Sequence, residues 1–211
     1  ADIHNADAIH PEWQGRATSG RLGGAPPEWT ELLIRAAALS GNDAGSSDEA
    51  AELRARALEL APAQPGTATV FGPEAPAEQD MEPTETLTFS WAADGDARLG
   101  PVLELFTAQG YRWLPMTALR HVVFTRPRHL VDLLWAPVEM TLRDGTQGSA
   151  LLPVRYAVLP EGADDALLLA RRTDWEALGR EGQYQGLGQR MLITEAGDVP
   201  WLDLRRIEWQ L

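Results

Sequence analysis

The chain has 211 residues, of which 44% are hydrophobic, so it can bury a core as one large domain or two small ones. It contains no cysteine, and all 18 of its basic residues are arginine, which excludes thiol nucleophiles, zinc–thiolate sites and every mechanism that needs a lysine. The net charge of −13 is unsuited to binding nucleic acid, which requires clustered positive charge.

The first predicted part is helical and covers residues 1–61. Residues 1–24 are expected to be irregular, because several glycines interrupt any periodic pattern. Residues 27–40 and 46–61 each place apolar side chains at helical spacing. We therefore predict a helical hairpin similar to a tetratricopeptide (TPR) unit. One such unit cannot bury its own apolar face, so it must pack against something else.

Four residues on that face are predicted to bind a partner: Trp29, Leu32, Leu33 and Ala36. Trp29 is the strongest candidate among them, because tryptophan is common among the residues that dominate interfaces. The alternative is that Trp29 makes a core contact between the two helices.

Residues 62–85 are rich in proline and acidic residues and are predicted to be a linker. Residues 86–211 are predicted to form a mainly antiparallel α+β domain, because apolar and polar residues alternate there and Asp144-Gly145 marks a tight turn. A short helix is expected at 127–135, and a strand followed by a turn at 164–178. The predicted strands are 86–91, 102–107, 111–116, 119–125, 138–142, 150–154, 190–194 and 201–209.

The segment Asp94–Pro101 carries two carboxylates beside Arg98, which suits acid–base or metal chemistry. The structural interpretation is a loop in which aspartates cap turn amides, Gly100 takes an unusual φ and Arg98 pairs with a carboxylate. We favour the loop, and we predict no catalytic, cofactor-binding or metal-binding residue. A metal-dependent hydrolase that uses Asp94 and Asp96 stays as an alternative.

The longest apolar run, Ala166–Ala170, is far shorter than the roughly 20 residues of a spanning helix. The chain starts at Ala1 without a signal-peptide pattern, so it is expected to be a cytoplasmic protein. It also lacks an initiator methionine, so two alternatives stay open: the chain is truncated at its start, or its first part has diverged.

Seven motifs follow one another over residues 89–208. They are Phe89-x-Trp91-x-x-Asp94-x-Asp96-x-Arg98-Leu-Gly-Pro101, Gly110-Tyr111-x-Trp113-x-Pro115, Pro127-x-x-Leu130-x-Asp132-Leu-x-Trp135-x-Pro137, Leu152-Pro153-x-Arg155-Tyr156, Leu169-Ala170-Arg171-x-Thr173-x-Trp175, Gly186-Leu-Gly188-Gln189-Arg190-Met191 and Leu204-Arg205-x-Ile207-Glu208. In this order they resemble the ImpE/TagJ family of accessory proteins of bacterial type VI secretion systems.

The resemblance implies TPR-like helices followed by an α+β part, with no catalytic activity. It also implies binding to a helix of the small contractile-sheath subunit (TssB-type), with an indirect link to the AAA+ ATPase that recycles the sheath. A purely structural role in the secretion apparatus is the alternative. Family members usually begin with several helical hairpins, whereas one is recognisable here. The signature residues that we interpret as a hydrogen-bonded scaffold are Asp94, Asp96, Arg98, Gly100, Pro101, Arg155, Arg171, Trp175, Gln189 and Arg190.

Overall fold

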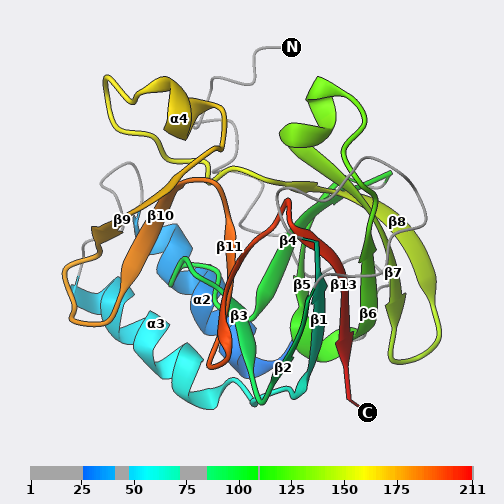
Figure 1. The fold of residues 1–211 in the computed structure, drawn as a ribbon. Coiled ribbons are helices and arrows are strands. Elements are labelled where there is room, and N and C mark those ends of the chain that lie inside the picture. Colours follow the sequence, from blue (N-terminus) through cyan, green and yellow to red (C-terminus); the bar gives the residue numbers. More distant parts are fainter. Residues whose placement is uncertain (1–25, 41–47, 72–84, 109, 211) are drawn as a thin grey trace.

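A large antiparallel sheet with helices packed on one face dominates the fold (Figure 1). The computed structural model describes residues 26–40, 48–71, 85–108 and 110–210. The helices are α2 (Glu28–Ser40), α3 (Asp48–Leu60) and α4 (Asp165–Leu168), with 3-10 helices η2 (Met116–Ala118) and η3 (Leu130–Leu133). The strands are β1 (Gly66–Val70), β2 (Glu85–Phe89), β3 (Ala92–Asp94), β4 (Val102–Thr107), β5 (Gly110–Pro115), β6 (Leu119–Phe124), β7 (Trp135–Leu142), β8 (Gln147–Pro153), β9 (Thr173–Ala177), β10 (Tyr184–Gly188), β11 (Met191–Thr194), β12 (Gly197–Pro200) and β13 (Leu204–Trp209).

The main sheet has eight strands in the order β2-β1-β13-β6-β7-β8-β4-β5. β7 and β8 form the predicted hairpin around Asp144-Gly145, which confirms the turn prediction. Gly145 adopts a φ of 87°, a conformation that side chains rarely tolerate. Val138 pairs with Ala150 on the inner face, while Glu139 pairs with Ser149 on the outer face. This alternation lets the hairpin bury one face and leave the other at the surface.

The inner face of the main sheet packs against a second, three-stranded sheet in the order β12-β11-β3. Leu103, Val122 and Met140 of the main sheet belong to the same buried cluster as Leu192 and Val199 of the smaller sheet. Strands β9 and β10 form a separate two-stranded sheet. The principal core therefore lies between two β-layers and not between the helices.

Helices α2 and α3 pack against each other and against the outer face of β4 and β5. Trp29, Leu33 and Ala57 of the helices share a buried cluster with Val102 and Trp113 of the strands. Burying a side chain such as that of Leu33 or Val102 contributes roughly 1.5–3 kcal/mol. Within the described residues, no helix is long and apolar enough to cross a membrane. The structure thus has mixed helix and large antiparallel sheet architecture, while the TPR-like nature of the helix pair stays a prediction.

The linker predicted at residues 62–85 is wrong for part of its length, because residues 66–70 form β1, which lies between β2 and β13. Its apolar residues are too small and its run too short to stand out among the surrounding prolines, although Ala68 is fully buried. Residues 72–84, like the irregular segment predicted at 1–24, lie outside the described residues.

Two further local predictions need correction. The short helix expected at 127–135 is the 3-10 helix η3. The region 164–178, expected to be a strand followed by a turn, begins with helix α4 and continues into strand β9. Asp164 caps α4 by accepting a hydrogen bond from the Leu167 amide at 3.0 Å, a local signal that favours a helix start there.

Candidate functional site: a buried ion-pair network

The loop that follows β3 is held by the side chains of two buried aspartates. The Asp96 amide donates to Oδ1 of Asp94 at 2.9 Å, and the amides of Leu99 and Gly100 both donate to the Asp96 carbonyl at 2.9 Å. Gly100 has a φ of 55° and its carbonyl accepts from the Asp94 amide at 2.8 Å. These bonds close a tight turn that fixes both carboxylates.

Arg98 clamps Asp96 with two hydrogen bonds. Its Nε donates to Oδ1 at 2.9 Å and its Nη2 to Oδ2 at 2.5 Å, and Oδ2 also accepts from the Gly186 amide of β10 at 3.1 Å. Asp96 is fully buried, whereas Arg98 is partly exposed. A bidentate pair of this kind is geometrically specific, so it also fixes β10 relative to the loop.

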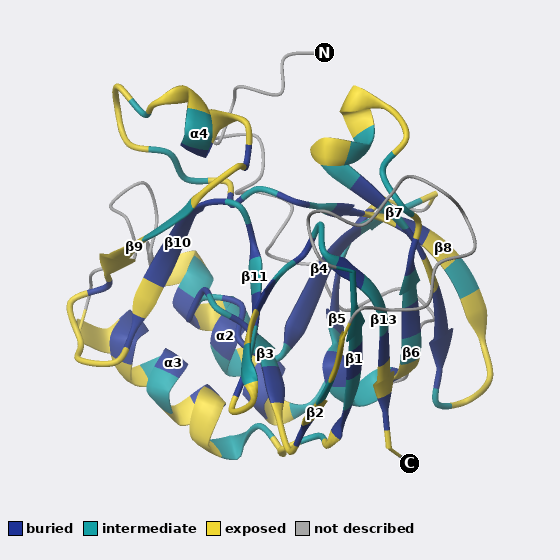
Figure 2. Cartoon of the chain, in the orientation of Figure 1, coloured by how far each residue is buried: buried dark blue, intermediate teal, exposed yellow. Residues whose placement is uncertain are grey.

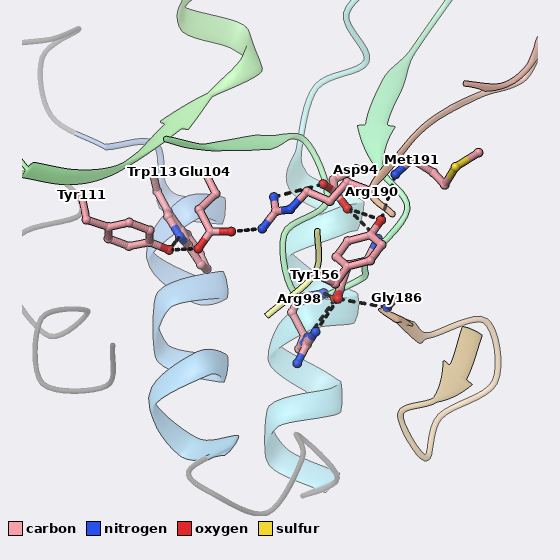
Figure 3. Close-up of polar contacts among 10 residues, drawn as sticks. Asp94, Arg98, Glu104, Tyr111, Trp113, Tyr156, Gly186, Arg190 and Met191 are labelled. Atoms are coloured by element: carbon pink, nitrogen blue, oxygen red, sulfur yellow. Dashed lines mark hydrogen bonds and ion pairs between the residues drawn. The ribbon is translucent and has the colours of Figure 1, made fainter. Parts of the chain in front are cut away.

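Asp94 belongs to a second, deeper group of charges (Figure 3). Its Oδ1 accepts from the Tyr156 hydroxyl at 2.9 Å, and its Oδ2 lies 3.4 Å from Nη1 of Arg190. The other terminal nitrogen of Arg190 donates to Glu104 on β4, and the guanidinium carbon lies 5.4 Å from the centroid of the Tyr156 ring. Arg190 therefore connects two carboxylates that belong to different strands.

The network continues through Glu104 to the cluster beneath the helices. Glu104 accepts a hydrogen bond from the hydroxyl of Tyr111, which in turn accepts from Nε1 of Trp113 at 2.6 Å. Tyr111 and Trp113 are buried in the same cluster as Trp29. A continuous set of polar contacts thus joins the Asp94 loop to the interface between the helices and the sheet.

Arg54 of α3 is a buried residue that the sequence interpretation missed. Its side chain is 1% exposed, and its Nε donates to Oε1 of Gln183 at 2.9 Å. Desolvation by burial lowers the pKa of Arg54, and the nearby charge of Arg98 lowers it further, while Asp96 opposes this. Arg54 shares one helical face with the buried Ala50 and Ala57, and a basic residue on an apolar face is a signal that could have identified it. With Arg54, the three buried carboxylates face three arginines.

Two glycines allow aromatic rings to approach the network closely. A Cβ added to Gly95 would lie 2.3 Å from the ring of Trp175, and one added to Gly186 would lie 2.0 Å from the ring of Tyr156. The rings of Trp175 and Tyr156 are tilted by 58° with centroids 6.0 Å apart. Trp175 is partly exposed. Because Gly95 and Gly186 have no side chains, the rings of Trp175 and Tyr156 have room to lie directly against the loop and β10.

The remaining signature residues lie at the border of the network or outside it. Arg155 forms an isolated bridge with Gln189 and donates through Nη1 to the Leu168 carbonyl at 3.1 Å. Pro101 is half-buried at the start of β4, and Arg171 is exposed. The structure therefore brings together the residues of the Asp94 loop, Trp175 and Arg190, but it does not bring Arg171 into that group.

The four residues predicted to bind a partner on the helices are placed differently from the expectation. Trp29, Leu33 and Ala36 are 4%, 0% and 1% exposed, and Leu32 is half-buried. The physical reason is that β4 and β5 of the same chain cover the apolar face of α2. Trp29 therefore lies in the core, as the alternative prediction for this residue states.

The arrangement gives no support to the metal-dependent hydrolase. Both aspartates are already engaged, Asp94 by Tyr156 and Arg190 and Asp96 by Arg98. Among the described residues, no three histidine or acidic side chains form a group suited to hold a metal ion. The interactions that the structure shows for Asp94 and Asp96 are with groups of the chain itself, which is typical of a structural role.

Burial raises the pKa of Asp94 to about 6, against the opposing effect of Arg190, and the neighbouring Asp96 adds to the rise. Because the folded state binds this proton more tightly than the unfolded state, whose pKa is about 3.9, the contribution of Asp94 to stability is full below that value. It is lost as the pH rises through about 6.

We expect this titration to appear when the wild type is compared with Asp94→Asn, which cannot titrate. The unfolding free energy of the wild type relative to the variant should fall between pH 4 and pH 7, by about 1.4 kcal/mol for each unit of pKa difference between the folded and unfolded states. Urea denaturation at a series of pH values measures this difference in unfolding free energy. Asp198→Asn, at an exposed position of β12, is the control. A pH-independent difference would contradict the assignment.

These features define a mixed α+β protein in which buried charges join a helix pair, a large sheet and two small sheets. A model of the ImpE protein family matches residues 87–208, more than half of the chain. The chain belongs to the ImpE family, which confirms the resemblance found in the sequence motifs.

Two relatives extend this comparison. The chain is 40% identical over 207 residues to the type VI secretion system accessory component TagJ of Pseudomonas aeruginosa, and the match spans 98% of this chain but 65% of TagJ. The crystal structure of protein VPA1032 from Vibrio parahaemolyticus has a similar fold, with a TM-score of 0.72 and 25% identity. That match covers 99% of this chain and 70% of the Vibrio chain.

Proposed function

We propose that this protein is a non-enzymatic accessory component of a bacterial type VI secretion system and that it acts in the cytoplasm by binding a helix of the small, TssB-type subunit of the contractile sheath. The observation that carries the proposal is the 40% identity to TagJ over almost the whole chain. Binding of the sheath subunit would connect the protein to sheath assembly or recycling and, indirectly, to the AAA+ ATPase.

Two observations support a binding role. The buried charges of the Asp94 loop, Glu104 and Arg190 are paired with one another, so this cluster serves the fold. The charge of −13 also favours association with a basic partner through long-range attraction.

The test is a titration of the protein with a fluorescently labelled peptide of the N-terminal helix of the cognate small sheath subunit. We expect saturable binding with a Kd below about 100 μM, which corresponds to a free energy of about −5.5 kcal/mol. A scrambled peptide of the same composition is the control. No saturable binding to the full-length protein would refute the proposal.

A further inference from the structure

One row of paired residues crosses the outer face of the main sheet from β5 to β7. Tyr111 pairs with Phe106, Phe106 with Leu151, and Leu151 with Pro137, so all four side chains lie on one face. Tyr111 and Phe106 pack in the cluster beneath α2 and α3. Leu151 is 43% exposed. The helices therefore cover one half of this row and leave the other half open.

The burial pattern shows the same division. In Figure 2 the strand β4 is mainly dark blue, whereas β8 carries yellow segments. A surface depression of about 510 Å³ lies at the open half, and it is lined by Phe106, Thr107, Pro137, Glu139, Ser149 and Leu151. The hollow thus follows β8 and β7 beside the edge of the helix layer.

Aromatic contacts make one wall of this hollow rigid. The ring of Phe106 lies 5.0 Å from that of Trp135 in an edge-on arrangement and 5.1 Å from that of Tyr111. Tyr111 is itself held by hydrogen bonds with Glu104 and Trp113, so the buried network supports the position of the Phe106 ring. A preformed apolar wall lowers the entropic cost of binding.

Glu139 is the one charged residue among the described residues that line this hollow. Glu139 is exposed, and its register neighbours Val123 and Ser149 carry no charge. Within the described part of the chain, the Glu139 side chain makes no ion pair or hydrogen bond. A carboxylate beside exposed Leu151 and Pro137 therefore favours a partner that combines apolar side chains with a basic one.

The dimensions favour a helix as that partner. Neighbouring strands lie about 4.8 Å apart, and a helix with its side chains is about 10 Å wide, so one helix spans the two strands β7 and β8. The adjoining half of the same face already accepts α2 and α3. A helix placed beside them would continue an existing layer.

We propose that the open half of the outer face, defined by Leu151, Pro137, Glu139 and the Phe106 wall, is the docking surface for an amphipathic partner helix. The apolar side of that helix covers Leu151 and Pro137, and a lysine or arginine at its border faces Glu139. The inference rests on the proposed function, since it assigns the binding site of the sheath-subunit helix.

The test compares variants by the same peptide titration. Leu151→Asp and Glu139→Arg should each weaken peptide binding at least tenfold. The melting temperature of both variants should stay close to that of the wild type, because both substitutions are at the surface. The matched controls are Leu39→Asp, at a leucine that is 45% exposed on α2, and Glu181→Arg, which makes the same change of charge elsewhere. Both controls should bind within about twofold of the wild type.

The outcomes separate the two proposals. If the wild type does not bind the peptide, the proposed function fails and this inference fails with it. If the wild type binds and Leu151→Asp and Glu139→Arg bind as tightly as the wild type, the surface assignment alone is overturned. The same holds if only Leu39→Asp weakens binding. Replacing a basic residue of the peptide by glutamate should restore part of the affinity of Glu139→Arg, which a general destabilisation of the variant would not do.

Discussion

Replacing Arg190 by alanine should destabilise the protein by about 3–5 kcal/mol, because it leaves two carboxylates buried without their shared cation. Arg190 is 3% exposed and bridges Asp94 on β3 and Glu104 on β4. Its loss would also remove the guanidinium that lies over the Tyr156 ring. The drop in unfolding free energy is measured by urea or guanidinium denaturation at neutral pH.

An exposed arginine provides the control for this experiment. Arg206 and Glu208 form an ion pair on β13 with side chains that are 41% and 49% exposed. Arg206→Ala should change the unfolding free energy by less than about 1 kcal/mol, since water already screens that pair. If Arg190→Ala were no more destabilising than Arg206→Ala, the buried network would not hold the strands together. A triple variant, Arg190→Met with Asp94→Asn and Glu104→Gln, tests whether removing the cation together with both carboxylate charges recovers stability.

Trp29→Ala should lower the unfolding free energy by about 3–5 kcal/mol through the cavity that it leaves between α2 and the sheet. Trp29 is 4% exposed and packs in one cluster with Val102 and Trp113. The affinity of the Trp29→Ala variant for the sheath-subunit peptide should equal that of the wild type at a temperature where the variant stays folded. Thermal unfolding and the peptide titration together separate a core residue from an interface residue.

Two comparisons make the result for Trp29 interpretable. Leu39→Ala, at an exposed position of the same helix, should cost about 1 kcal/mol or less. Trp29→Phe retains a ring and keeps the protein folded if the alanine variant is too unstable to titrate. Weaker peptide binding by Trp29→Phe with an unchanged melting temperature would contradict the core assignment.

The antiparallel part of the fold is largely predictable from alternation and turn residues. Residues 138–154 show both signals, so two strands joined by a turn at Asp144-Gly145 were expected, and the structure has them as β7 and β8. Strand β1 was not expected, because its identity depends on neighbours that are distant in the sequence. A five-residue segment between prolines has no periodicity of its own to reveal it.

The candidate site shows a similar limit. The spacing of Asp94, Asp96 and Arg98 identified the loop as a distinct feature, but Glu104 and Arg54 carried no local signal strong enough to connect them with it. Trp29 illustrates the other limit, since an apolar helix face indicates burial without indicating which surface provides it. In this protein the covering surface is the chain's own sheet.

The position of β1 has a consequence for the order of folding. β1 pairs on one side with β13, so Gly66 lies opposite Trp209, although most of the β-rich part of the chain separates them in the sequence. A ribosome must therefore have synthesised and released the chain as far as β13 before the eight strands can be joined. Contacts between such distant segments slow the search for the native state. Until β13 arrives, β1 keeps an unpaired edge, and this interval is when the growing chain is most open to aggregation.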